Sequence, residues 1–396
     1  MDTPLPAMRG HYSIRNPAAN SLLRILDAGL RLLYRRQLLT AAPANVRRIL
    51  ISNIAHLGDI IVATSVLPAL QDRFPGVEFG FLVGSWCVPI LEGHPLVARF
   101  HVLDHWMLTR AKVPFREKWR IYRRTRTKAL REIKAVKYDL AIDLYWNMPN
   151  TLPFLKQTGI PIRAGYGSAG FGPLATHCLE LSESRNSVSE RHEQLLSLLG
   201  VEPQSLARMK PSLAPVSPEA RQDLAQHFKE AGIDLNNYLV FHPGAADTFR
   251  EWPEDKWRAL SVALTALGHH VIFTGYSKRE SEMIARICSG LPGTLNLSGR
   301  LPWVSFVAVI AQARLTVCVD TVAGHIAGAV GTPSAVITAG RYPYLWKPIG
   351  AACDVLMAEV PCAPCHRNYG CEGMECMQDL EAERVHRTCL KLLGQA

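Results

Sequence analysis

The sequence predicts an α/β protein made of two Rossmann-like domains, each with a parallel sheet. The chain has 396 residues, whereas one domain takes roughly 100–200. Short apolar runs alternate with helical segments, which is typical of parallel strands joined by crossover helices. A proline-rich stretch at 201–218 separates two such alternations and is expected to be the linker. Because parallel sheets bind ligands at the carboxyl ends of their strands, the expected cleft between the domains is the default site.

The composition is globular, with 48% hydrophobic and 20% charged residues. The net charge of +10 is concentrated in two segments: residues 110–137 carry twelve Lys and Arg against two Glu, and residues 1–48 carry eight Arg against two Asp. Such local patches suit an acidic partner better than the broad basic face of a nucleic-acid-binding protein. A solvated helix face is the alternative interpretation of 110–137.

No membrane-spanning segment is expected, because the apolar stretches 49–70 and 315–340 contain charged and polar residues. The N-terminus lacks the charged-then-apolar pattern of a signal peptide. These features predict a cytoplasmic protein whose ten cysteines are reduced thiols or metal ligands.

Residues 1–46 are expected to form an N-terminal extension, with a loose tail at 1–20 and a basic amphipathic helix at 21–39. One face of this helix carries Arg24, Arg31 and Arg35, and the opposite face carries Leu22, Leu26, Leu30 and Leu33. Such a helix either lies on an anionic membrane or packs against its own domain.

The first domain is expected at 47–200, with strands at 48–54, 77–83, 99–103 and 138–144. A helix at 59–73 and a helix in the basic segment follow from the periodicity. Gly58 and Asp59 come directly after the first strand. Gly58 permits a close backbone approach. Asp59 either caps the following helix or serves chemistry at the strand end.

The turn after the first strand excludes two nucleotide-binding classes. It contains no G-x-G-x-x-G, which argues against a dehydrogenase, and the chain has no G-x-x-x-x-G-K-[ST] of P-loop nucleotidases.

The second domain is expected at 219–361. Strands are predicted at 238–242, 270–274, 294–297, 315–319 and 334–338, with helices at 253–267, 277–289, 302–313 and 321–330. After the first of these strands, the backbone of His242-Pro-Gly244-Ala can face a phosphate, and Arg250 can add fixed positive charge. An ordinary loop with one solvated arginine is the alternative.

A second phosphate-binding pattern lies at the fourth strand of this domain. Asp320 ends the strand, and Thr321 begins a helix rich in small residues, whose free N–H groups can reach a diphosphate. Asp320 can bind sugar hydroxyls. His325 either donates to phosphate or packs against the sheet.

The last segment, 362–396, combines a cysteine cluster with a C-terminal helix. Four thiols with the spacing C-x2-C-x5-C-x4-C are a candidate structural zinc site: Cys362, Cys365, Cys371 and Cys376. Reduced cysteines or a disulfide are the alternatives, and nothing in the pattern indicates a catalytic metal.

Taken in order, these motifs resemble glycosyltransferase family nine, the bacterial ADP-heptose:lipopolysaccharide heptosyltransferases, over residues 47–390. The resemblance rests on the stretch 49–61 with Pro68, on His242-Pro-Gly-Ala with Arg250-x-Trp-Pro, and on Asp320-Thr-x-x-Gly-His325 with Gly331-Thr-Pro. The cysteine-rich tail is also similar to tails in that family.

The resemblance implies a GT-B fold, with the acceptor on the first domain and the nucleotide sugar on the second. It implies an inverting transfer that requires no metal or other cofactor. The family's general base corresponds here to Asp59. Such a base would deprotonate the acceptor hydroxyl while positive charge stabilises the leaving diphosphate.

The donor-binding residues follow from the same resemblance. Arg250 matches the family's phosphate contact, and Asp320 with Thr321 matches the residues at the diphosphate sugar. The acidic residue at the ribose would be Glu280 or Glu282. Other residues of these motifs complete the expected donor site: Gly58, His242, Gly244, Gly324 and His325.

The acceptor side departs from the family pattern. Many members have Arg-x-Ser-Ser before Leu-Gly-Asp, whereas this chain has Asn53-Ile-Ala-His56. We expect Asn53 and His56, with Arg123 and Arg124 of the basic segment, to contact an acidic glycolipid acceptor. The basic segment and the 21–39 helix would hold the protein peripherally on the cytoplasmic face of the inner membrane.

The function predicted from the sequence is therefore heptosyl transfer from ADP-heptose to a lipopolysaccharide core. Two alternatives stay open. One is a transferase of the same fold that uses another nucleotide sugar for a different surface glycan. The other is a non-catalytic nucleotide-sugar-binding module.

Overall fold

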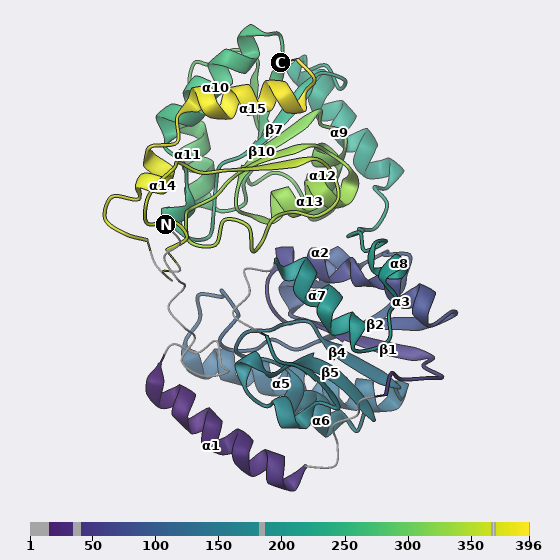
Figure 1. The fold of residues 1–396 in the computed structure, drawn as a ribbon. Helices are drawn as coiled ribbons and strands as arrows, with labels where there is room; N and C mark the ends of the chain where they lie inside the picture. The colour runs from purple at the N-terminus through teal and green to yellow at the C-terminus, as the bar shows by residue number, and fades with distance from the viewer. Residues whose placement is uncertain (1–15, 35–40, 182–186, 366, 368–369, 396) are drawn as a thin grey trace. The chain divides into compact units, whose positions relative to one another are not determined.

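The computed structural model describes residues 16–34, 41–181, 187–365, 367 and 370–395. The chain divides into two compact units, residues 1–210 and 211–396, which are described separately as unit 1 and unit 2 (Figure 1). The boundary falls inside the expected linker 201–218, which also contains the short helix α8 (Pro203–Leu206). Within the described ranges, no helix has the length and apolarity needed to cross a membrane.

Unit 1 is built on a six-stranded parallel sheet in the order β3-β2-β1-β4-β5-β6. Its strands are β1 (Arg48–Ser52), β2 (Glu78–Val83), β3 (Val97–Val102), β4 (Leu140–Asp143), β5 (Ile162–Tyr166) and β6 (His177–Leu179). Its other helices are α1 (Pro17–Leu33), α2 (Leu57–Thr64), α3 (Val66–Arg73), α4 (Val88–Leu91), α5 (Phe115–Val136), α6 (Leu152–Thr158) and α7 (Val188–Ser197), with 3-10 turns η1 (Ser85–Cys87), η2 (Gly167–Ala169) and η3 (Gly172–Leu174).

Unit 2 has a second six-stranded parallel sheet, in the order β12-β11-β10-β7-β8-β9. Its strands are β7 (Tyr238–His242), β8 (His270–Phe273), β9 (Thr294–Asn296), β10 (Leu315–Val319), β11 (Ser334–Ile337) and β12 (Cys353–Leu356). Its helices are α9 (Pro218–Ala231), α10 (Glu254–Ala266), α11 (Lys278–Cys288), α12 (Trp303–Ala311), α13 (Val322–Val330), α14 (Glu375–Gln378) and α15 (Ala382–Leu392), with the turn η4 (Thr248–Arg250).

Both sheets have the same connectivity. If the strands of each unit are counted from its first strand, the order is 3-2-1-4-5-6, which is the doubly wound Rossmann order. In such sheets the order reverses between the first and fourth strands, and ligands bind at the carboxyl ends there. This switch point lies between β1 and β4 in unit 1 and between β7 and β10 in unit 2.

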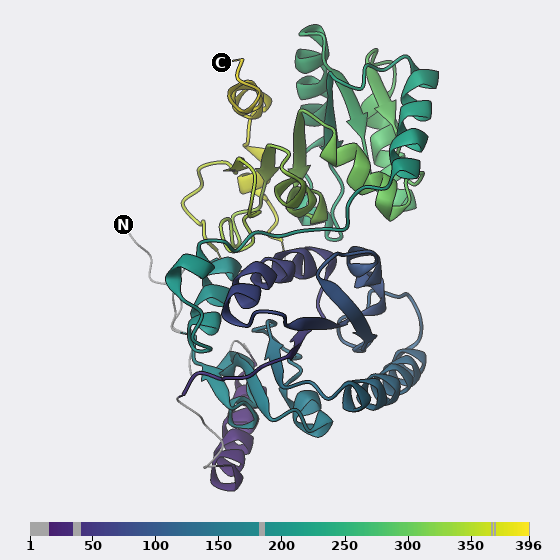
Figure 2. The ribbon, with the colours of Figure 1, turned by 90° about the vertical axis from the view of Figure 1, so that its right-hand side faces the viewer.

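Each sheet is covered on both faces, which is why its central strands are continuous apolar runs (Figure 2). Ile49, Leu50 and Ile51 of β1 are fully buried. In unit 1, α2, α3 and α7 lie on one side of the sheet and α5 and α6 on the other. In unit 2, Trp252 and Trp257 anchor the core beneath α10, and residues of α15 join the same core.

The structure corrects several boundaries predicted from the sequence. The helix expected at 59–73 is two helices, α2 and α3, which meet at Ser65. Three strands were missed: β5, β6 and β12. The residues expected to form a separate cysteine-rich segment are part of unit 2, where α15 packs against α10.

The amphipathic helix α1 packs on unit 1 through a seam beside its predicted leucine face. Leu22 and Leu26 of that face are 67% and 43% exposed, whereas Leu23 and Asp27 are buried. The predicted extension of this helix through 35–39 lies outside the described residues. The N-terminal extension is thus held on unit 1 by a narrow seam.

Candidate active site

Asp59 lies in the first turn of α2, next to the carboxyl end of β1. Its Oδ2 accepts a hydrogen bond from the backbone N–H of His56 at 3.0 Å, so the carboxylate caps the helix. The side chain is half-buried. Asp59 can cap the helix and still accept a proton at the switch point of unit 1. A carboxylate has further lone pairs beyond the one that accepts from the His56 N–H. Gly58 precedes it in the same turn.

The loop between β1 and α2 is fixed by its own polar groups. Asn53 is buried, and its Oδ1 accepts from the N–H of Ala55 at 3.1 Å. The indole N–H of Trp86 donates to the Ala55 carbonyl at 2.7 Å. Asn53 therefore shapes the loop that presents His56 and Asp59, and its predicted acceptor contact stays a prediction.

A buried polar cluster behind this loop was not predicted from the sequence. Asp143, at the end of β4, accepts from the N–H of Thr151 at 2.6 Å, and the Thr151 hydroxyl lies 2.7 Å from that of Ser52. Burial raises the pKa of Asp143 to about 6, although hydrogen bonds from neighbouring N–H groups act in the opposite direction. The short apolar strand β4 gave no signal that its last residue would be buried.

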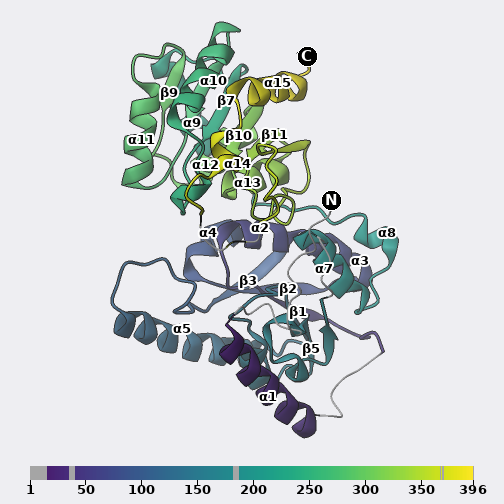
Figure 3. The ribbon, with the colours of Figure 1, turned by 60° about the vertical axis from the view of Figure 1, so that its left-hand side comes forward.

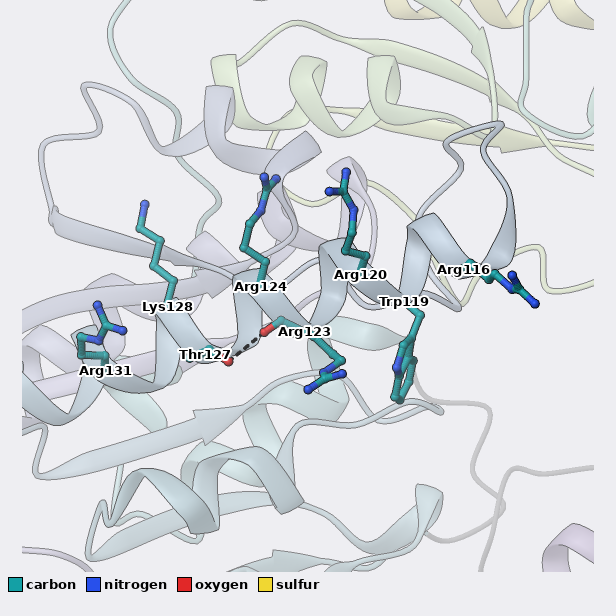
Figure 4. A pocket seen from close by; sticks show the side chains of 8 residues that line it. All are labelled: Arg116, Trp119, Arg120, Arg123, Arg124, Thr127, Lys128 and Arg131. Atoms are coloured by element: carbon teal, nitrogen blue, oxygen red, sulfur yellow. Dashed lines mark hydrogen bonds between the residues drawn. The ribbon is translucent and has the colours of Figure 1, made fainter.

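Arg123 and Arg124 are exposed residues of α5. With neighbouring side chains they line a surface hollow of about 690 Å³ (Figure 4). A separate cavity of about 280 Å³ lies at the ends of β1 and β3 in unit 1. Its lining includes Trp106, Tyr122 and Phe154 together with Asn150. Sequence reasoning missed this cavity because its residues come from five separate segments.

In unit 2, Gly244 makes room for Glu280. A Cβ at position 244 would lie 2.4 Å from Glu280 Cγ and 2.7 Å from its Cδ, so no larger residue fits. Glu280 Oε2 accepts from the N–H groups of Tyr276 and Ser277, at 2.6 and 2.9 Å. The acidic side chain thus spans from the loop after β8 to the loop after β7.

Of the two acidic candidates, Glu280 and not Glu282 reaches this loop. Glu282 points to the exposed side of α11, where it pairs with Lys278 at 3.8 Å. The 243–251 loop is further held by Arg279, which pairs with Glu251 at 2.6 Å and donates to the Ala245 carbonyl at 2.7 Å. The Arg279–Glu251 pair was not anticipated, because the two residues are far apart in sequence.

Arg250 and Asp320, both predicted to bind the donor, lie next to each other. Its guanidinium lies 3.6 Å from the Asp320 carboxylate and 2.9 Å from that of Asp247. Arg250 Nε is buried and has no hydrogen-bond partner among the described residues. The switch point of unit 2 therefore carries a fixed cation between two acids.

The N-terminus of α13 follows Asp320 directly. Thr321 is the N-cap residue, but its hydroxyl donates to the Val319 carbonyl at 3.2 Å and makes no side-chain cap. Gly324 faces the sheet, where a Cβ would lie 3.2 Å from Val336 Cγ2. Its role is thus close packing of α13, and any donor contact would come from its backbone.

Both histidines of the donor motifs are buried and neutral. His242 Nδ1 lies 3.0 Å from the Thr274 hydroxyl, and burial lowers its pKa to about 4. Burial also lowers the pKa of His325, against the charge of Asp320. Neither imidazole is a cation at neutral pH, so each can act on a phosphate only as a neutral hydrogen-bonding group.

The four cysteines of the tail form no group arranged to hold a metal ion, within the part of the chain that the structure describes. Cys362 is exposed and Cys376 is buried, and all four are free thiols. Burial raises the pKa of Cys376, which favours the protonated thiol over the thiolate that zinc needs. A structural zinc site at these four cysteines stays a prediction from their spacing.

Comparison with known proteins agrees with this arrangement. Residues 126–373 match the family model of glycosyltransferase family 9 (heptosyltransferase). Lipopolysaccharide heptosyltransferase 1 of Pseudomonas aeruginosa is 28% identical over 327 residues, which cover 80% of this chain and 86% of that protein.

Solved structures share the fold at low sequence identity. A family 9 glycosyl transferase from Veillonella parvula has a TM-score of 0.72 at 18% identity, covering 91% of this chain and all of that one. The E. coli heptosyltransferase WaaC with ADP has a TM-score of 0.62 at 22% identity, covering 87% and 99%. Two Rossmann-like units with these motifs at their switch points form the GT-B fold. The chain belongs to glycosyltransferase family 9, and it is a glycosyltransferase.

Proposed function

We propose that this enzyme transfers a heptose from ADP-heptose to a lipopolysaccharide core acceptor, with inversion and with Asp59 as the general base. The observation that carries the proposal is the convergence of Glu280, Arg250 and the N-terminus of α13 at the ends of β7, β8 and β10 in unit 2. The similar E. coli structure with ADP supports the choice of an adenine nucleotide.

On the donor side, each of these groups is placed to bind one part of a nucleotide diphosphate sugar. Glu280 offers a carboxylate to the ribose hydroxyls. Arg250 and the N–H groups at the start of α13 meet the diphosphate, whose charge grows as the glycosidic bond to the sugar breaks. Asp320 is within reach of the same region and is the candidate partner of the sugar hydroxyls. We propose that these groups stabilise the leaving ADP without a metal ion.

On the acceptor side, Asp59 accepts the proton of the attacking hydroxyl. The nucleophilic oxygen forms a bond to the anomeric carbon while the bond to the ADP phosphate oxygen breaks, and the configuration inverts. The cap from His56 N–H to Oδ2 fixes the orientation of the carboxylate. A base held by a helix terminus does not have to be ordered at each turnover.

The acceptor is proposed to be an acidic glycolipid met at the cytoplasmic face of the inner membrane. His56 beside Asp59, and Arg123 and Arg124 on α5, are the candidate acceptor contacts. The relatives named lipopolysaccharide heptosyltransferase support this acceptor class.

The donor is tested by calorimetric titration with ADP and ADP-heptose against UDP- and GDP-sugars. Preferential binding of the adenine forms is expected. A preference for UDP or GDP forms would keep the fold and overturn the sugar assignment, which is the alternative of another nucleotide sugar and another surface glycan.

The base is tested with Asp59→Asn, whose amide oxygen can still accept from His56 N–H. We expect kcat to fall by roughly 10²–10⁴-fold while the Kd for ADP stays unchanged. The matched control is Asp72→Asn, which removes only the exposed pair with Arg208. Unchanged kcat in Asp59→Asn would refute the assigned role, and NMR of the product anomer tests inversion.

A further inference from the structure

We propose that unit 1 docks on an anionic membrane through the side that carries α1 and α5. In this arrangement the exposed apolar face of α1 enters the boundary between headgroups and acyl chains, and the arginines of α5 lie among the phosphate headgroups. The inference rests on the proposed function, because it names the surface that brings the enzyme to a lipid-borne acceptor.

The apolar face of α1 is large and faces away from the protein. Five big aliphatic side chains are between 43% and 78% exposed: Leu22, Ile25, Leu26, Leu32 and Leu33. At 100° per residue they fall within an arc of about 120°. A contiguous apolar face of this kind on a helix marks an interaction surface rather than scattered exposed residues.

The same helix is fixed to unit 1 by a separate seam. Leu23 and Asp27 are buried, and Asp27 Oδ1 accepts from the N–H of Phe171 at 2.9 Å. The Lys156 ammonium lies 4.6 Å from the centre of the Tyr34 ring. These contacts orient the helix so that its apolar face stays outward. Arg24 and Arg31, on the side away from that face, give it the charge pattern of an interfacial helix.

The basic residues of α5 supply the electrostatic attraction to an anionic membrane. This helix carries nine Lys and Arg against two Glu. Both glutamates are used within the unit, by Arg120 and by Lys128 with His101. Arg116, Arg123, Arg124 and Arg131 form no ion pair in the described part of the chain. Figure 4 shows Arg120, Arg124 and Lys128 projecting side by side from one face of the helix.

An aromatic cluster stands at the first turn of α5. The rings of Trp106, Phe115, Trp119 and Tyr122 pack edge-on or tilted, with centroids 5.3–6.4 Å apart. Phe115 is 60% and Trp119 42% exposed. Amphipathic aromatic side chains beside basic ones are typical of the membrane interface, where one edge is apolar and the other wet.

The two elements lie on the same side of unit 1. Both helices lie on the side of the sheet opposite α2 and α3 (Figure 3). Figure 2 shows them at opposite ends of that side: α5 packs at the β3 edge, and α1 packs on the turn η3 near the β6 edge. We propose that a flat bilayer meets both ends. Stable attachment to a bilayer needs two signals, and an inserted apolar face plus a basic patch supplies them. Because four of these arginines form no ion pair with a described residue, charge complementarity favours an anionic lipid surface over a second basic copy of this chain.

The test is sedimentation of the full chain with vesicles of phosphatidylcholine alone or with phosphatidylglycerol. Binding is expected only to the anionic vesicles, and it should weaken as salt is raised. The double variant Arg116→Gln/Arg131→Gln should bind at least about ten-fold more weakly, since each basic residue contributes roughly five-fold. Ile25→Gln/Leu32→Gln should lose a similar factor, because glutamine keeps helix propensity and removes the apolar contact.

Matched controls come from unit 2. Val262→Gln/Val304→Gln changes exposed apolar residues of α10 and α12, and Arg221→Gln/Lys229→Gln removes two charges from α9. Both should bind vesicles as the parent does. Circular dichroism and ADP titration without vesicles check that every variant is folded and that the donor site is intact.

Three outcomes would overturn the proposal: no binding to anionic vesicles, equal losses in the unit 2 controls, or undiminished binding by the α1 variant. A dimer that the α1 variant converts to monomer, with vesicle binding unchanged, would assign the apolar face to a second copy. Loss of vesicle binding with intact preference for ADP-heptose would leave the proposed reaction standing. Vesicle binding without ADP-heptose binding would overturn the reaction and not the surface.

Discussion

Replacing Gly244 with alanine tests the contact that joins the β7 and β8 loops. The added methyl group would lie 2.4 Å from Glu280 Cγ, about 1.4 Å inside ordinary van der Waals contact. Glu280 cannot swing away freely, because its carboxylate is held by two backbone N–H groups of the α11 N-terminus. Either the 243–251 loop moves or the cap of α11 breaks.

The loss of stability in Gly244→Ala depends on which of these two changes occurs. If the loop moves, overpacking this dense site costs roughly 1–3 kcal/mol, whereas loss of the helix cap costs about 1 kcal/mol. Unit 2 should therefore lose about 1–3 kcal/mol of its unfolding free energy, which for a unit of this size lowers Tm by roughly 2–12 °C. Since Glu280 is the proposed ribose ligand, the Kd for ADP should rise by at least about ten-fold, the effect of one lost charged hydrogen bond.

The assay combines thermal unfolding with calorimetric ADP titration on four proteins: the parent, Gly244→Ala, Glu280→Ala and the double variant. Truncating Glu280 removes the atoms that the methyl group would strike. The double variant should thus be destabilised by clearly less than the sum of the single effects, which is the signature of a direct contact. Gly29→Ala, where nothing lies within 4 Å, is the control for the glycine replacement itself.

Two results would refute this reasoning. One is a Gly244→Ala variant with the Tm and ADP affinity of the parent, because Glu280 then does not occupy the space above residue 244. The other is full additivity in the double variant, which would place the damage in the loop backbone rather than in the Glu280 contact.

Three further predictions concern charged and titrating groups. Arg250→Gln should raise the Kd for ADP by about ten-fold, measured by calorimetry, whereas Arg286→Gln, which loses only an exposed ion pair, should not. Because burial raises the pKa of Asp143 to about 6, its favourable contribution is complete below about pH 4 and is lost as pH rises through 6. The unfolding free energy of the parent, relative to Asp143→Asn, should therefore fall by roughly 2–3 kcal/mol between pH 4 and pH 7.5; a constant difference in denaturant titrations would contradict this. Since burial lowers the pKa of His242 to about 4, its ring should stay neutral in NMR spectra down to pH 5, and stability should be lost as pH falls through 4. A ring that titrates near 6.5 would show that it is solvated.

The sequence predicted the position of a candidate site residue best where that residue follows a strand. Asp59, Arg250 and Asp320 each follow an apolar run long enough to identify as a strand, and the Rossmann topology then brings them to the switch points. Periodicity could not decide between Glu280 and Glu282. That choice depends on how α11 begins, and Ser277 with Glu280 forms the capping box that turns this carboxylate inward.

The missed strands and the unpredicted packing seam of α1 have physical causes. The strand β5 contains Arg163, which is buried because the carbonyls of Ile160, Pro161 and Leu174 accept from its guanidinium. A charged residue in so short a segment interrupts the hydrophobic pattern from which a strand is predicted. In α1, a tertiary hydrogen bond to Asp27 selects the seam that packs, and leucine spacing alone carries no information about that partner.

The placement of Arg250 between Asp247 and Asp320 has a consequence for how the donor is taken up. The guanidinium is already neutralised by carboxylates in the free enzyme. An incoming diphosphate therefore competes for the guanidinium with carboxylates of the protein itself. The affinity of Arg250 for a diphosphate then depends on how much more strongly it binds the diphosphate than the carboxylates. Weakly charged ligands are therefore disfavoured. When the proposed product ADP departs, the two carboxylates can pair with Arg250 again, so the arginine is not left without a counter-ion.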